Sequence, residues 1–217
     1  MMDQANRCEI GETGTMTDAG VDVGTGVLLI ISGPSGVGKT TITHAVREHF
    51  GDSAAFSVSV TTHPKTEADV DGVDYTFIDD GAFDRMVEAD ELLEWADVFG
   101  KRYGTPAAYV DERLDAGKLV LLEIDVQGAE QVRAKRPDAL GLFILPPSDE
   151  TLLRRLRDRK REDEAQIKRR FAKAKDEIAR ARAGGVYDHY IVNDSLDEAI
   201  ERAIGLVRDR LGACKPG

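Results

Sequence analysis

The chain is poor in the residues that cross-link small secreted domains or carry a chain through a membrane. Its 217 residues include 2 cysteines, Cys8 and Cys214, which lie close to the two ends. Two cysteines so far apart do not form a disulfide framework, so we expect a reducing, cytoplasmic location. No apolar run approaches the roughly 20 residues that a membrane-spanning helix needs. The sequence therefore predicts no membrane partner.

Positive charge is also in the minority. The chain has 29 lysines and arginines and 40 aspartates and glutamates, for a net charge of -11. Broad binding of nucleic acid depends on cations that neutralise phosphates, so this balance argues against a nucleic-acid partner. A small, locally basic phosphate pocket remains compatible with it. Residues 1–26 are rich in Gly, Thr and Asp and contain no apolar core of a signal peptide. They predict a disordered N-terminal tail.

Apolar runs alternate with helical patterns through the rest of the chain. The runs cover residues 27–32, 56–61, 119–125, 142–145 and 189–193. Continuous apolar runs are typical of strands buried on both faces, and helices between them supply right-handed crossovers. We therefore expect an α/β fold with a parallel five-stranded core sheet. In the last helix, Ser195 is the expected N-cap and Glu198 completes a capping box.

One stretch fits the phosphate-binding pattern G-x-x-x-x-G-K-[ST] at every fixed position. It consists of Gly33, Pro34, Ser35, Gly36, Val37, Gly38, Lys39 and Thr40. An apolar run precedes it and a helical segment, Thr41–Phe50, follows, so its backbone amides would form an anion nest at a helix N-terminus. Lys39 would reach the β- and γ-phosphates of a nucleoside triphosphate, and Thr40 would bind Mg²⁺. The alternative is a tight glycine turn without a ligand.

Two segments interrupt the alternation of strands and helices. Residues 62–106 are rich in charge, aromatic residues and glycine, with a short strand expected at 75–78. We interpret them as a lobe inserted into a core made of 27–61 and 107–212. Residues 157–166 form a charged segment between two helical patterns and predict a lid. The alternative for that segment is an exposed, charged helix.

Several motifs beyond the phosphate-binding loop resemble guanylate kinases, in the family's order and spacing, from about Val27 to Leu211. They are Ser57–Thr62, Asp71–Phe77, Leu92–Ala96, Tyr103–Pro106, Leu122–Gly128, Phe143–Ser148 and Val192–Asp194. The resemblance implies the three-part fold of a P-loop nucleoside monophosphate kinase: a core, an inserted GMP-binding lobe and a helical lid. The implied reaction converts ATP and GMP into ADP and GDP with Mg²⁺.

The resemblance also implies roles for individual residues. Glu94 and Asp125 would accept hydrogen bonds from guanine N1–H and its amino group, which adenine does not offer in that pattern. Thr105 would meet guanine O6. The acceptor phosphate would be bound by Ser59, Tyr75 and Tyr103. Arg155, Arg159 and Arg170, in and beside the lid, would act with Lys39 on the transferred phosphoryl group, and Asn193 would belong to the ATP site.

The chain departs from the family where the acceptor phosphate binds. His63 and Thr66 stand at positions where the family normally has arginine, and Asp69 replaces a usual glutamate. Each lost charge-assisted hydrogen bond would cost about 1.5–3 kcal/mol. Three interpretations follow: His63 and Lys65 compensate, the affinity for GMP is reduced, or the acceptor is another guanine nucleotide such as dGMP. In the lid, residues 160–163 replace a turn that usually contains glycine.

A different class of function is also open, a non-catalytic interaction module of the guanylate kinase type. Such modules lose the chemistry of the phosphate-binding loop, whereas Lys39, Thr40 and the lid arginines are present here. We therefore favour the enzyme. The sequence leaves open whether the protein is a monomer or a homo-oligomer.

Overall fold

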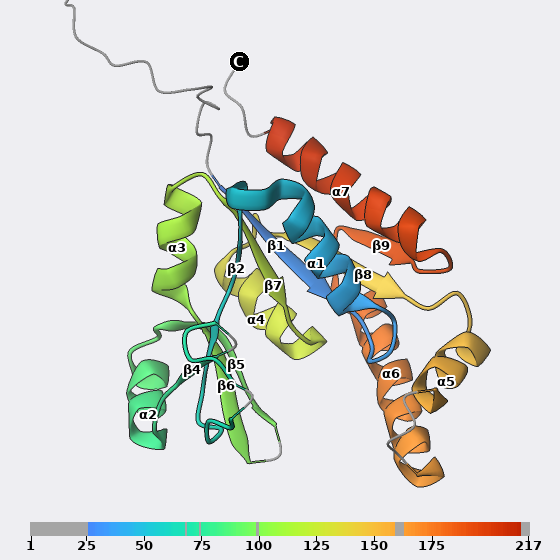
Figure 1. The fold of residues 1–217 in the computed structure, drawn as a ribbon, viewed down its shortest axis with the longest axis horizontal. Coiled ribbons are helices and arrows are strands. Elements are labelled where there is room, and N and C mark those ends of the chain that lie inside the picture. Colours follow the sequence, from blue (N-terminus) through green and yellow to red (C-terminus); the bar gives the residue numbers. More distant parts are fainter. Residues whose placement is uncertain (1–25, 68, 74, 99, 159–162, 214–217) are drawn as a thin grey trace, which may run out of the picture.

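The computed structural model describes residues 26–67, 69–73, 75–98, 100–158 and 163–213. It contains a five-stranded sheet of order β2-β7-β1-β8-β9 and a four-stranded sheet of order β4-β3-β6-β5. The predicted tail, apart from Gly26, lies outside the described residues, as do residues 159–162 of the lid predicted over 157–166, Arg159 among them. Figure 1 shows the smaller sheet and the α5–α6 pair on opposite sides below the larger sheet.

The larger sheet is parallel throughout, which confirms the predicted α/β core. Its strands are β1 (Val27–Ser32), β2 (Ala54–Phe56), β7 (Leu119–Glu123), β8 (Leu140–Leu145) and β9 (His189–Val192). The central strand β1 is buried along its whole length. Because helices cover both faces, its side chains are apolar on both sides rather than alternating with polar ones.

The helices form the two outer layers of the core. They are α1 (Lys39–Phe50), α3 (Ala107–Asp115), α4 (Val126–Lys135), α5 (Asp149–Arg157), α6 (Glu164–Gly184) and α7 (Leu196–Ala213). On one face, Leu29 and Ile31 of β1 belong to a cluster with side chains of α1 and α7. On the other face, Leu28 and Ile30 pack with α3 and α4. Figure 1 shows α1 and α7 in front of the sheet and α4 behind it.

The strand predicted over residues 56–61 is wrong, because this stretch is divided between the two sheets. Residues 54–56 pair with β7 in the core, whereas β3 (Ser59–Thr61) pairs with β4 and β6. The lobe sheet therefore begins inside the segment predicted as core. Residue pattern alone favours an extended chain on both sides of Val58, and it does not indicate which sheet each half joins.

The smaller sheet and one helix make up the lobe. Besides β3, its elements are β4 (Tyr75–Phe77), α2 (Asp80–Glu88), β5 (Leu92–Val98) and β6 (Lys101–Pro106). The sequence prediction included β4 but not the antiparallel pair β5–β6. Val60, Phe83 and Leu92 form a small core of their own. Arg102 lies over the Phe83 ring, 4.7 Å from its centroid, and ties the sheet to α2 through ion pairs with the α2 carboxylates.

Side chains cap the N-termini of α6 and α7. The backbone N–H of Glu198 donates to the Ser195 hydroxyl at 3.4 Å, so Ser195 is the N-cap of α7 as predicted. Asp163 and Gln166 form a capping box at the start of α6.

A membrane span would need a longer apolar helix than any in the described part of the chain.

Candidate active site

The loop between β1 and α1 has a backbone that only glycine adopts easily. Gly33, Gly36 and Gly38 have φ angles of 150°, 91° and 93°. A Cβ atom at Gly38 would lie 2.6 Å from the Asn193 amide nitrogen, and one at Gly33 would lie 2.5 Å from the Ile144 carbonyl oxygen. Close approach and positive φ together explain why glycine occupies these positions. The loop leads directly into the N-terminus of α1, where backbone amides and the helix dipole attract anions.

Lys39, the first residue of α1, folds back over this loop. Its ammonium donates to the carbonyl oxygens of Gly33 and Pro34 at 2.5 and 3.1 Å. The positive charge therefore lies against the loop that presents the amides. A phosphate bound there would meet both sets of donors.

Thr40 contacts an acidic residue that the sequence analysis did not identify. Its hydroxyl donates to the carboxylate of Glu123 at 2.7 Å. Glu123 is the last residue of β7, the neighbour of β1, and ligands of parallel sheets bind at the carboxyl ends of such strands. The position of Glu123 at the carboxyl end of this strand is the sequence signal that could have identified it as a site residue. A hydroxyl and a carboxylate are oxygen ligands of the kind that Mg²⁺ prefers. The described residues contain no cluster of three or more His, Cys, Asp or Glu suited to a metal ion.

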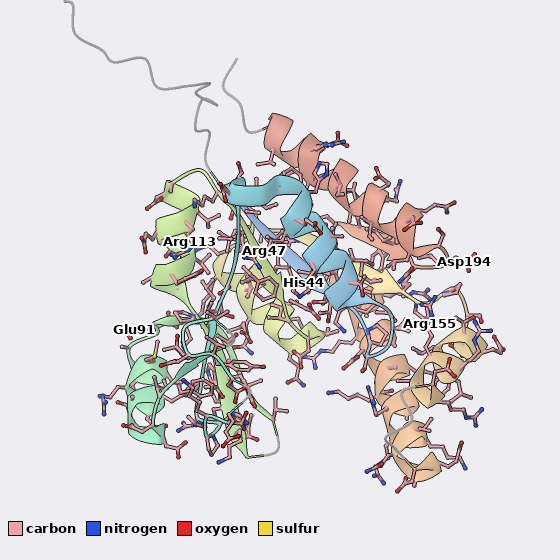
Figure 2. The ribbon with its side chains drawn as sticks, viewed as in Figure 1. His44, Arg47, Glu91, Arg113, Arg155 and Asp194 are labelled. Carbon is pink, nitrogen blue, oxygen red and sulfur yellow. The ribbon has the colours of Figure 1, made fainter. Side chains whose placement is uncertain are left out.

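Asn193 connects the end of β9 to the same loop. Its side-chain amide donates to the Val37 carbonyl at 2.7 Å, and the residue is 3% exposed. Arg155 donates to the Asn193 backbone carbonyl at 3.1 Å. Figure 2 shows Arg155 extending from α5 toward the segment after β9, where Asp194 lies. This contact brings a predicted catalytic arginine to the rim of the loop.

Arg170 reaches the loop from α6. Its guanidinium donates to the Ser35 hydroxyl. Two of the three predicted arginines therefore approach the loop from the helices on either side of the charged segment. The third, Arg159, lies outside the described residues.

The predicted base-recognition residues are brought together at the junction of lobe and core. Glu94 is 7% exposed and accepts a hydrogen bond of 2.6 Å from the Thr105 hydroxyl. Asp125 is the N-cap of α4 and accepts from the Gly128 amide at 2.9 Å. Burial raises the pKa of Glu94 and the Asp125 charge acts in the same direction, while the Thr105 hydrogen bond opposes them. The single Thr105 hydroxyl hydrogen is used by Glu94, so donation to a base requires this hydroxyl to rotate.

A cleft of about 420 Å³ opens beside these residues, within the usual range for small-ligand sites. It is lined by Ala96, Asp97, Val98, Asp125, Val126, Gln127, Lys173, Asp176, Glu177 and Arg180. The lining residues come from β5, the start of α4 and the middle of α6. Burial raises the pKa of Glu177, although the charges of Lys173 and Lys39 lower it. The cleft therefore carries charges of both signs.

The predicted acceptor-phosphate residues gather around a cluster of rings in the lobe. The rings of Tyr75 and Tyr103 are 5.6 Å apart, and His63 lies 6.5 Å from Tyr75 between ring centroids. Ser59 is the register partner of Tyr75 across β3 and β4. The Lys65 ammonium is 6.0 Å from the centroid of the Phe77 ring. The fold thus places two hydroxyl-bearing rings, an imidazole and an ammonium side by side.

Comparison with known proteins agrees with this geometry. The family model for guanylate kinase matches residues 25–209. The chain belongs to the guanylate kinase family. Among its relatives, the guanylate kinase of Thermobifida fusca is 47% identical over 180 residues, covering 83% of this chain and 90% of the relative. That of Leifsonia xyli subsp. xyli is 45% identical over 190 residues, covering 87% and 73%.

A solved guanylate kinase supports the fold assignment. The crystal structure of the enzyme from Anaplasma phagocytophilum superimposes with a TM-score of 0.66 at 33% identity and covers 87% of both chains. The α/β fold described above, with its parallel five-stranded sheet, is therefore that of the guanylate kinase family.

The departure from the guanylate kinase pattern at Thr66 has a structural counterpart. The Thr66 amide and hydroxyl both donate to one oxygen of Asp69, each at 2.7 Å. These bonds lower the pKa of Asp69, the backbone bond contributing most. The hydrogen-bonding groups of Thr66 and Asp69 therefore satisfy each other within a closed turn. Lys65 is exposed, and His63 has a buried Nδ1 atom with no hydrogen-bond partner.

Proposed function

We propose that this protein transfers the γ-phosphoryl group of ATP to GMP, giving ADP and GDP. The observation that carries the proposal is the buried carboxylate of Glu94, which faces Gly128 and Asp125 beside the cleft. A carboxylate accepts from guanine N1–H and the 2-amino group, whereas adenine offers an acceptor at N1 and leaves the carboxylate unpaired. The scarcity of cysteine supports a cytoplasmic location for this reaction.

Phosphoryl transfer depends chiefly on alignment and on stabilising charge, so none of these residues needs to act as a base. The loop amides and Lys39 would hold the phosphates of ATP. Arg155 and Arg170 already contact the loop or its neighbour Asn193, and they would exchange these protein partners for phosphate oxygens. Arg159 stays a prediction in the same role.

The oxygens of Thr40 and Glu123 would hold a Mg²⁺ ion at the start of α1. When bound, Mg²⁺ neutralises charge on the β- and γ-phosphate oxygens. For this role a lone pair of the Thr40 hydroxyl would face the metal while its hydrogen still points at Glu123. Glu123 would then accept from the water shell that Mg²⁺ usually keeps.

The direct test is a steady-state screen with ATP·Mg²⁺ and five acceptors: GMP, dGMP, AMP, UMP and CMP. We expect kcat/KM for GMP to exceed that for AMP by about 10⁴-fold, because a buried acceptor without a donor is strongly unfavourable. Comparable use of AMP would contradict the base assignment. A preference for dGMP or another guanine nucleotide over GMP would favour the second candidate. No turnover with any acceptor would favour an interaction module.

We also propose that Lys65 supplies part of the positive charge for the acceptor phosphate. Its ammonium lies over the Phe77 ring, and that ring is in turn a neighbour of the His63 and Tyr75 rings. A lysine carries its charge on a flexible stem and can reach a phosphate from a shifted position. It cannot form the two parallel hydrogen bonds of an arginine, so the replacement should be incomplete.

Lys65→Ala should raise the KM for GMP by about tenfold, the equivalent of one charge-assisted hydrogen bond, and leave the KM for ATP nearly unchanged. Conversely, the double variant His63→Arg with Thr66→Arg should lower the KM for GMP. Lys101→Ala is the matched control, because it removes a lobe cation whose charge acts on Asp80. A silent Lys65→Ala together with no gain in the double variant would show that the phosphate is held elsewhere.

A further inference from the structure

Strand β5, which carries Glu94, is an edge strand. The sheet order β4-β3-β6-β5 gives it one strand neighbour, β6. An edge strand presents backbone N–H and C=O groups that need partners from outside the sheet. The element packed along this edge is α4, which belongs to the core and not to the lobe. The base-recognition strand is therefore attached to both parts of the molecule.

Gln131 of α4 takes the place of a neighbouring strand at Trp95. Its side-chain oxygen accepts from the Trp95 amide at 3.1 Å, and its side-chain nitrogen donates to the Trp95 carbonyl at 3.0 Å. One amide side chain thus satisfies both backbone groups of the residue that follows Glu94. A carboxylate would lack the donor and an aliphatic side chain would lack both groups.

A second residue of the same helix holds the other end of this segment. Lys135, one turn after Gln131, donates to the Leu92 carbonyl at 2.6 Å and to the Asp90 carboxylate at 2.5 Å. The two contacts fix the backbone before and after Glu94. The register of β5 against β6 shifts between Leu92 and Glu94, so the ladder is irregular at this point. The side chains of α4 hold β5 from its opposite edge at this point.

The N-terminal half of the same helix faces the Glu94 side chain. A Cβ atom at Gly128 would lie 2.8 Å from a carboxylate oxygen of Glu94, so this position leaves just enough space for the carboxylate. Asp125 caps the helix. Gly128, Gln131 and Lys135 are spaced by three and four residues and therefore share one helical face. Asp125, the second base-recognition residue, lies at the start of this face. Gln131 and Lys135 on the same face bind β5, the strand that carries Glu94.

We infer that Gln131 is a positioning residue for guanine recognition: it attaches β5 to α4 so that Glu94 keeps a fixed place relative to Asp125. This inference rests on the proposed function, because its readout is the use of GMP. Both carboxylates must meet neighbouring donors on one base, so a displacement of about 1 Å at Glu94 weakens both hydrogen bonds. Gln131 is not among the described residues that line the cleft, so it would act through the backbone of Trp95.

Gln131→Met tests the inference, because methionine has a similar length and neither hydrogen-bonding group. We expect the KM for GMP to rise by about tenfold, from the loss of two neutral hydrogen bonds. The kcat at saturating GMP and the KM for ATP should stay nearly unchanged, and the ratio of kcat/KM for GMP over AMP should fall. Trp95 is the single tryptophan, so its fluorescence reports the same shift in a GMP titration without turnover. Lys135→Met should change the GMP values in the same direction.

Arg136→Met, at the C-cap of α4, is the control. Arg136 makes two hydrogen bonds, of 2.7 and 2.8 Å, to Asp111 of α3, so its loss affects attachment to the core and not to β5. It should lower the melting temperature and leave the KM for GMP unchanged. If wild type phosphorylates GMP and Gln131→Met changes neither its KM nor the base ratio, the inference is overturned while the function stands. If wild type neither binds nor phosphorylates GMP, both are overturned.

Discussion

Lys39→Ala should reduce kcat by about 10²–10³-fold, the usual effect of removing one preorganised donor from a transition state. The Lys39 ammonium lies against the carbonyls of Gly33 and Pro34, inside the loop proposed to hold the ATP phosphates. Charge builds up on the transferred phosphoryl group and its leaving oxygen, and alanine offers nothing to balance it. The fold should survive, because the buried side chains of α1 are Ile42, Thr43 and Val46. The measurement is the kinase rate beside the circular dichroism spectrum.

Lys118→Ala is the control for this variant. Lys118 precedes β7, at the opposite end of the sheet from the carboxyl ends that carry the loop. The variant Lys118→Ala removes the same charge as Lys39→Ala and should leave kcat unchanged. Turnover of Lys39→Ala above about a tenth of the wild-type rate would contradict the catalytic role, because it would correspond to less than 1.4 kcal/mol of barrier.

Much of the core was predictable because its signals are local. The glycine pattern at 33–40 and the apolar runs at 27–32 and 119–125 each occupy a few consecutive residues. The loop and both strands are present, although the second strand ends at Glu123 and not at Asp125. Residues 56–61 show the limit of such signals. Their pattern favours an extended chain, but the division between β2 and β3 depends on pairing with residues far along the sequence.

The contacts that arrange the candidate site were less accessible from the sequence. Thr40 in the first turn of α1 and Glu123 at the end of β7 meet although they are 83 positions apart in the chain. Gln131 meets Trp95 across 36 positions, and nothing in its local sequence distinguishes it from an exposed helical glutamine. A resemblance can suggest which residues bind a substrate. It does not show which residues hold those binders in place, because such contacts follow from packing.

Both halves of the proposed site use the same structural device. The phosphate-binding loop leads from β1 to the N-terminus of α1, and Asp125 lies between β7 and the N-terminus of α4. Since β1 and β7 are parallel neighbours, their carboxyl ends lie at the same edge of the sheet. The donor loop and one base-recognition residue are therefore fixed by a single pair of strands. Glu94 comes from the lobe instead, and this explains why its attachment to α4 matters.

Glu94→Gln should lower kcat/KM for GMP by about 10²-fold, because one acceptor oxygen becomes a donor that opposes a guanine N–H group. The KM for ATP should stay nearly unchanged, since Glu94 lies in the base pocket and not at the phosphate-binding loop. The control is Glu91→Gln, which removes an exposed carboxylate just before β5, on the outer side of the lobe (Figure 2). Equal changes in the GMP and ATP parameters would instead identify Glu94 as a residue that only supports the fold.

The pH dependence of kcat/KM for GMP, measured for wild type and for Glu94→Gln, distinguishes the effect of the Glu94 charge from the effect of its shape. Burial raises the pKa of Glu94, with a further contribution from the Asp125 charge, so this carboxyl takes up a proton at a higher pH than an ordinary glutamate. Only the ionised form accepts at both oxygens. As the pH falls through the raised pKa, kcat/KM for GMP in wild type should therefore decrease, and bound GMP should lower that pKa. Glu94→Gln has no titrating group there and should lose this part of the profile. If the decrease persists unchanged in Glu94→Gln, a different group controls guanine binding.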